Sequence, residues 1–101
     1  MRVGDKQDAG YKALASAIVA QAIYDYRVAL IRLKRYDSYE SLTYQARNRR
    51  DKAEVTRRGC ERFFRSAYWR SLTELDGVRL MEKLRDEVQS NEETERILQR
   101  L

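Results

Sequence analysis

The stretch AGYKALASAIVAQAIYDYRVALIRLKRY, residues 9–36, decides the fold class of this chain. Its apolar residues recur at spacings of three and four, which is the repeat of a helix with one buried face. Six alanines between Ala9 and Ala22 add the strongest helix-forming residue to this pattern. The sequence therefore predicts a long helix over about residues 9–36, with a face suited to close packing against another helix.

A second helical pattern runs along residues 39–67. Small and apolar side chains again alternate at three and four residues, and only Arg49 and Thr56 interrupt them. We predict a second helix over about residues 38–70, packed antiparallel against the first as a helical hairpin. Gly59 lies inside this segment and costs about 1 kcal/mol relative to alanine, so a break at this residue stays open.

Two shorter helices are predicted after the hairpin. Asp76 precedes an apolar run, with Leu75 and Leu80 placed as a hydrophobic staple, so we expect Asp76 to cap a helix over about residues 77–89. A last helix is expected over about residues 92–100. Proline is absent from the chain, which favours uninterrupted helices. The prediction is a single all-α domain over residues 1–101, a long antiparallel helical hairpin with one or two shorter C-terminal helices.

The composition argues against catalysis. The chain has no histidine and a single cysteine, Cys60. Serine nucleophiles usually depend on a histidine base, and zinc sites need several cysteine and histidine ligands. The acidic residues near the C-terminus are interpreted as solvated helix surface. We therefore expect a protein that is not an enzyme and that binds no metal, no cofactor and no small-molecule substrate.

The expected location is the cytoplasm. The sequence shows no continuous run of about 18 apolar residues that would span a membrane, and the opening MRVGDKQDAG lacks the apolar core of a signal peptide. With one cysteine the chain forms no internal disulfide, which is typical of a reducing compartment.

The formal net charge is +5, and the positive charge is concentrated in residues 1–70. When residues 39–70 are placed on one helix, the small and apolar side chains take one side and most arginines take the other. This arginine stripe spans about 33 Å and ends in a tryptophan. The candidate residues for binding a partner or a nucleic acid are Arg47, Arg50, Arg58, Arg62, Arg65 and Trp69.

Several interpretations of these residues stay open. Three interpretations of the arginine stripe are open. It is an ordinary solvated helix face, a surface that contacts phosphates, or a surface that contacts an acidic protein. Phe63 and Phe64 fall on the apolar side and are predicted core residues. For Trp69 we favour burial against the following helix over an exposed stacking role. Tyrosines gather near the end of the hairpin with Arg27, Arg32, Lys34 and Arg35, either as half-buried rings or as an interface.

The segment CERFFRSAYWRSLTELDG, residues 60–77, is followed by LMEKLRDEV. Together they resemble a group of small proteins carried by phages and integrative elements of Gram-positive bacteria. The matching features are an R-F-F-R-S stretch, an aromatic pair, an L-T-x-x-D-G step, a short L-x-x-x-L helix and a D-Y-R step in an alanine-rich helix. Here these are Arg62–Ser66, Tyr68-Trp69, Leu72-Thr73 with Asp76-Gly77, Met81–Leu84 and Asp25–Arg27. The basic segment 43–58 and Gly59 depart from the pattern.

This resemblance implies a role in a phage or another mobile element, a context that includes anti-CRISPR proteins. The leading hypothesis is a non-catalytic interaction protein, an anti-CRISPR inhibitor that binds a host CRISPR–Cas effector or its RNA or DNA. The alternative is a small basic nucleic-acid-binding accessory or regulatory protein of the element, and a third is an assembly component. A homodimer is also expected, because two long helices expose more apolar edge than the C-terminal segment covers.

Overall fold

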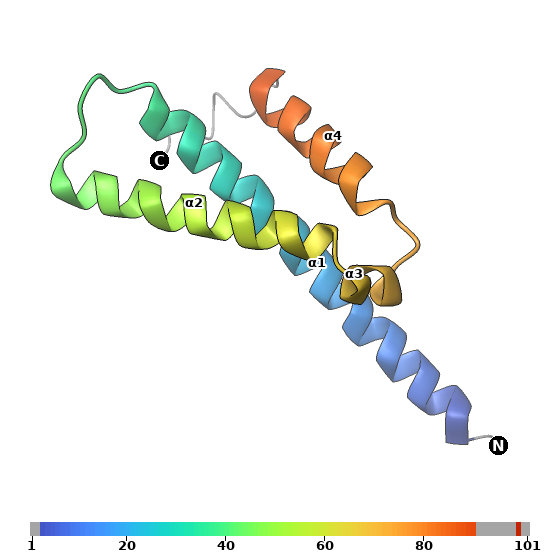
Figure 1. The fold of residues 1–101 in the computed structure, drawn as a ribbon. Helices are drawn as coiled ribbons and strands as arrows, with labels where there is room; N and C mark the ends of the chain where they lie inside the picture. The colour runs from blue at the N-terminus through green and yellow to red at the C-terminus, as the bar shows by residue number, and fades with distance from the viewer. Residues whose placement is uncertain (1–2, 91–98, 100–101) are drawn as a thin grey trace.

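The computed structural model describes residues 3–90 and residue 99, with the side chains of residues 9–90 and 99. This part of the chain contains no strand, so the predicted all-α class is confirmed. Figure 1 shows a helical hairpin, with a short helix beyond the end of its second arm and a last helix folded back across it. The helices are α1 (Val3–Asp37), α2 (Tyr44–Phe64), α3 (Ala67–Leu72) and α4 (Gly77–Ser90).

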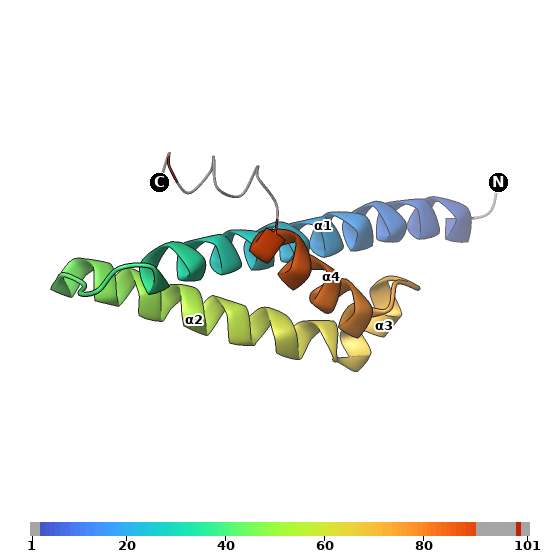
Figure 2. The same cartoon turned by 90° about the horizontal axis from the view of Figure 1, so that it is seen from above.

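The longest helix, α1, supplies one side of the core. It begins at Val3, earlier than the predicted start near residue 9. Its buried residues Val19, Ala22 and Tyr26 join one cluster with side chains from the other three helices. The first turns of α1 extend past the rest of the molecule, as both views show (Figures 1 and 2).

The connection between α1 and α2 is longer than the sequence suggested. The predicted start of the second helix near residue 38 is wrong, because Ser38 instead closes the end of α1, where its hydroxyl donates to the carbonyl of Arg35 at 2.6 Å. Thr43 is the true N-cap, and its Oγ1 accepts a hydrogen bond from the amide of Ala46 at 3.1 Å. The chain therefore reverses through residues 38–43 before α2 begins.

The second helix does not continue to residue 70, so the predicted single rod over residues 38–70 is also wrong. Gly59 lies inside an unbroken α2, and the helix ends later, at Phe64. The hydroxyl of Ser66 donates to the carbonyl of Phe63 at 2.6 Å and accepts from the amide of Trp69 at 3.1 Å. One serine thus satisfies the end of α2 and the start of α3, which allows the chain to turn.

The fourth helix agrees with its prediction. The carboxylate of Asp76 accepts hydrogen bonds from the amides of Val78 at 3.1 Å and Arg79 at 3.2 Å, so it caps α4 as expected. The other end of α4 is held by Lys34 of α1, whose ammonium donates to the carbonyl of Val88 at 3.0 Å. A cation at this position also complements the helix dipole. The helix predicted over residues 92–100 lies outside the described residues, except for residue 99.

The core is aromatic and brings all four helices together. Phe64 packs edge-on against Tyr26 and Trp69, with ring centroids 5.2 and 5.0 Å away. Gly77 sits against this cluster, since a Cβ added there would lie 2.0 Å from the carbonyl oxygen of Phe64. Met81 of α4 is 1% exposed and completes the cluster. The phenylalanines of the segment 60–77 are therefore structural, as predicted.

One expectation about membranes needs correction. Residues Ala9–Asp37 of α1 are long and apolar enough to cross a membrane by length and composition, so the statement that no such stretch exists is wrong. A core helix of a water-soluble protein passes the same test. Here α1 buries Ala22 and Tyr26 against other helices of the same chain.

Candidate functional site

The predicted stripe of arginines is divided by the structure. Arg47 and Arg62 are exposed and form no ion pair with any residue of the described part of the chain. Arg58 is exposed, but its Nε lies 3.1 Å from the carboxylate of Glu54 in the preceding turn. These three residues remain on the outer side of α2, where one of the three positive charges is already paired.

The remaining predicted residues do not extend the stripe. Arg50 is half-buried and pairs with Asp37 at 3.0 Å. Arg65 is exposed at the residue that ends α2. Trp69 is 1% exposed, and its indole donates to the carbonyl of Leu75 at 2.9 Å. The favoured burial of Trp69 is confirmed, and the turn at Ser66 is the reason that this ring leaves the arginine side of the helix.

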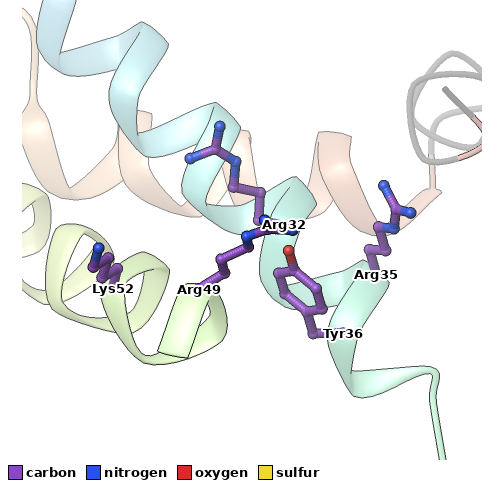
Figure 3. A pocket seen from close by; sticks show the side chains of 5 residues that line it. All are labelled: Arg32, Arg35, Tyr36, Arg49 and Lys52. Atoms are coloured by element: carbon purple, nitrogen blue, oxygen red, sulfur yellow. The ribbon is translucent and has the colours of Figure 1, made fainter. Parts of the chain in front are cut away.

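A different set of basic residues meets near the end of the hairpin where the loop of residues 38–43 joins α1 to α2. A hollow of about 360 Å³ lies between the last turns of α1 and the first turns of α2. Figure 3 shows Arg49 reaching from α2 toward Tyr36 on α1, with Arg35 and Lys52 on either side. Among the residues that the structure describes, those that line this hollow include no acidic side chain; they are Arg32, Arg35, Tyr36, Arg49 and Lys52.

A second hollow continues the first along the hairpin. It measures about 380 Å³ and shares Arg32 and Lys52 with its neighbour. We call the two hollows together the basic groove. The described lining of the second hollow has fewer basic residues than the first and includes the carboxylate of Asp25. Its residues are Tyr24, Asp25, Val28, Ala29, Arg32, Lys52, Ala53 and Thr56.

The charges in the groove are not neutralised within the described part of the chain. Arg32, Arg49 and Lys52 are exposed and form no ion pair or hydrogen bond with the residues that the structure describes. Among the described residues, the guanidinium of Arg35 donates only to the hydroxyl of Tyr39, at 3.2 Å. Other arginines of the described part of the chain have a carboxylate partner, namely Arg27, Arg50, Arg57, Arg58 and Arg85. Like charges brought together without counter-charge repel one another and attract anions.

Sequence reasoning found only parts of this groove. Arg32 and Arg35 belonged to the predicted cluster of tyrosines and arginines near the end of the hairpin. Arg49 appeared only as an exception on the apolar side of the second helix, which is the side that faces α1. Lys52 carried no signal of its own. A charged residue on the inner face of a predicted hairpin was the available hint, because it must either be paired or face a solvent-filled gap.

A network of polar side chains, separate from the basic groove, lies in the core around Glu61. The carboxylate of Glu61 is held by Tyr26, Arg57 and Arg85, at 2.8, 2.9 and 2.5 Å. Burial alone would raise the pKa of Glu61, but the hydrogen bonds from Arg85, Tyr26 and Arg57 outweigh it and lower the pKa. Burial, and then the hydrogen bond to Glu61, raise the pKa of Tyr26 to about 12. All these groups have partners, so we interpret them as a structural network.

Two other kinds of site, a reactive thiol at Cys60 and a metal site, find no support in the described part of the chain. Burial raises the pKa of the half-buried Cys60 thiol, which keeps the thiol protonated and unreactive. Among the side chains that the structure describes, those of residues 9–90 and 99, there is no group of three or more acidic, cysteine or histidine residues that would hold a metal ion.

Comparisons with known proteins add no assignment. No protein-family model, no curated protein and no solved structure matches the chain.

Proposed function

We propose that this protein is a non-catalytic binding protein whose basic groove holds a nucleic acid. The observation that carries the proposal is the unbalanced charge of the groove, where Arg32, Arg49 and Lys52 have no carboxylate partner in the described part of the chain. Binding phosphates would relieve the repulsion between these cations and release counterions from the nucleic acid. Guanidinium groups also match the geometry of phosphate oxygens in a way that favours two parallel hydrogen bonds.

We propose further that the biological role is inhibition of a host CRISPR–Cas nuclease in the bacterial cytoplasm. The resemblance of the segment 60–77 to small phage proteins supports this role, and the groove offers a surface for guide RNA or target DNA. The alternative, a nucleic-acid-binding accessory or regulatory protein of a mobile element, would use the same groove. Inhibition of cleavage separates the two.

The first experiment measures binding to fluorescently labelled RNA and DNA by anisotropy at two salt concentrations. If four cations contact phosphates, affinity for a single strand should fall about 50-fold between roughly 50 and 200 mM salt. The double variant Arg49→Glu and Lys52→Glu should lose most of the affinity and much of this salt dependence.

The matched control changes the same amount of charge elsewhere. Arg79 and Lys83 are exposed on α4, in a hollow that also contains acidic residues. The double variant Arg79→Glu and Lys83→Glu should therefore bind almost as well as the unchanged protein. If both double variants lose affinity equally, the protein attracts nucleic acid only through its net charge, and the proposed site is wrong.

The second experiment adds the protein to purified, guide-loaded Cas nucleases and follows cleavage of a target DNA. Inhibition by the unchanged protein and by the α4 control, but not by the groove variant, would support the inhibitor proposal. Nucleic-acid binding without inhibition of any effector of the host would instead favour the accessory role.

A further inference from the structure

Aromatic rings, as well as cations, line the basic groove. Tyr24 lines the second hollow and is 62% exposed, and Tyr36 lines the first hollow. Tyr39 is 48% exposed, and its hydroxyl accepts a hydrogen bond from Arg35, one of the residues that line the first hollow. The groove therefore has a ring near each end.

The cations lie between these rings. Arg32 and Lys52 line both hollows, so they mark the middle of the groove. Arg49 and Arg35 line only the first hollow and extend the positive charge toward Tyr36. Tyr24 and Tyr36 are twelve positions apart on one helix, which corresponds to about 18 Å. A stacked nucleic-acid strand would place about five nucleotides along this length, at about 3.4 Å each.

This arrangement matches one form of nucleic acid better than another. In a duplex the bases are already stacked on one another and offer no free face to a protein ring. A single strand can lay its phosphates against the cations and its bases against exposed rings.

We infer that the basic groove binds a single nucleic-acid strand, RNA or DNA, in preference to a duplex. The inference rests on the proposed function and specifies the ligand of the same site. The rings of Tyr24 and Tyr36 stack on bases, and the side chains of Arg32, Arg35, Arg49 and Lys52 hold the phosphates. Asp25, the only carboxylate among the described residues that line the groove, accepts a hydrogen bond from Gln21 at 2.8 Å and keeps phosphates away from the Tyr24 end.

The test compares three probes of the same sequence and of about 12 nucleotides, which is well above the predicted site length. The probes are a single RNA strand, a single DNA strand and the DNA duplex, all measured at one low salt concentration. Either single strand should bind at least about tenfold more tightly than the duplex. Preference for RNA over DNA, or the reverse, identifies which of the two strands the groove accepts.

The tyrosine variants test the stacking directly. Tyr24→Ala should weaken single-strand binding about tenfold, since stacking on one base is worth that much, and should leave the salt dependence unchanged. Tyr44→Ala is the matched control, because Tyr44 is also an exposed tyrosine, at 77%, and is not among the residues that line the groove. Circular dichroism of both variants verifies that the helices are intact.

The possible failures of the test are distinguishable. Duplex binding as tight as single-strand binding, still weakened by Arg49→Glu with Lys52→Glu, overturns this inference and leaves the proposed function standing. No detectable binding of any probe overturns both. Poly-glutamate that competes as well as a strand of equal charge, with no effect of Tyr24→Ala, also overturns the inference and indicates an acidic protein partner.

Discussion

Glu61 accepts a hydrogen bond from the hydroxyl of Tyr26 at 2.8 Å, inside the packed hairpin. Glu61 itself is 8% exposed and Tyr26 is 0% exposed. The guanidinium of Arg85 donates to both partners, to the carboxylate at 2.5 Å and to the tyrosine oxygen at 2.9 Å. One carboxylate therefore links α1, α2 and α4, and it orients α4 on the hairpin.

Replacing this carboxylate should destabilise the fold. Glu61→Gln keeps the shape of the side chain but removes the charge that holds Arg57 and Arg85. We expect a loss of about 2 kcal/mol in the free energy of unfolding, measured by urea denaturation. Glu82→Gln is the control, because Glu82 is exposed on α4, and it should change stability by less than about 0.5 kcal/mol. Equal effects of the two variants would contradict the structural role of Glu61.

The carboxylate of Glu61 should also make the free energy of unfolding depend on pH. The pKa of Glu61 is lower in the folded protein than its ordinary value of 4.5, so its contribution is complete above that value. The contribution is lost as the pH falls through the lowered pKa of the folded state. Unfolding free energies measured from pH 7 to below pH 4 should therefore converge for the unchanged protein and Glu61→Gln. A constant difference over this range would show that the charge of Glu61 is not what stabilises the fold.

Two glycines should respond to alanine in opposite ways. At Gly77 an added Cβ would lie 2.0 Å from the carbonyl oxygen of Phe64, which is backbone and cannot move aside cheaply. Gly77→Ala should cost at least about 2 kcal/mol of stability. At Gly59 the nearest atom is the end of the Arg62 side chain, 4.0 Å away, so Gly59→Ala should stabilise the helix by about 0.5–1 kcal/mol. Thermal or urea unfolding of the two variants checks both signs.

The expected homodimer stays a prediction that sedimentation equilibrium can test. Tyr11 and Leu14 are exposed on the first half of α1, at 52% and 59%. If a second copy covers this face, Leu14→Glu should convert a dimer to a monomer, whereas Ser16→Glu on another side of the helix should not. A monomer for the unchanged protein at all accessible concentrations would contradict the prediction.

The helices themselves could be predicted from the sequence because their signals are local. The alternation of apolar residues defined both arms of the hairpin, and the position of Asp76 before an apolar run predicted the cap of α4. The same helical geometry placed Phe63 and Phe64 on the core side. Helix formation and capping depend on residues within a few positions of one another, so they leave a readable pattern.

The end of α2 was missed for a reason that is only partly local. Ser66 can cap a helix, but a serine in the middle of an apolar pattern is also tolerated inside one. The turn takes place here because it lets Trp69 reach the cluster around Phe64 and lets α4 return to the hairpin. These contacts join residues that no helical periodicity relates.

The sequence by itself determined the all-α class, the two long arms and the excess of positive charge. Only the tertiary structure decided where that charge gathers: Arg49, an exception to the apolar pattern of α2, faces Arg32 and Arg35 of α1. It also decided that Glu61 is buried and shared by three helices. Periodicity gives the direction of a side chain from its own helix, whereas its neighbours depend on how distant helices pack, which is set by the whole core.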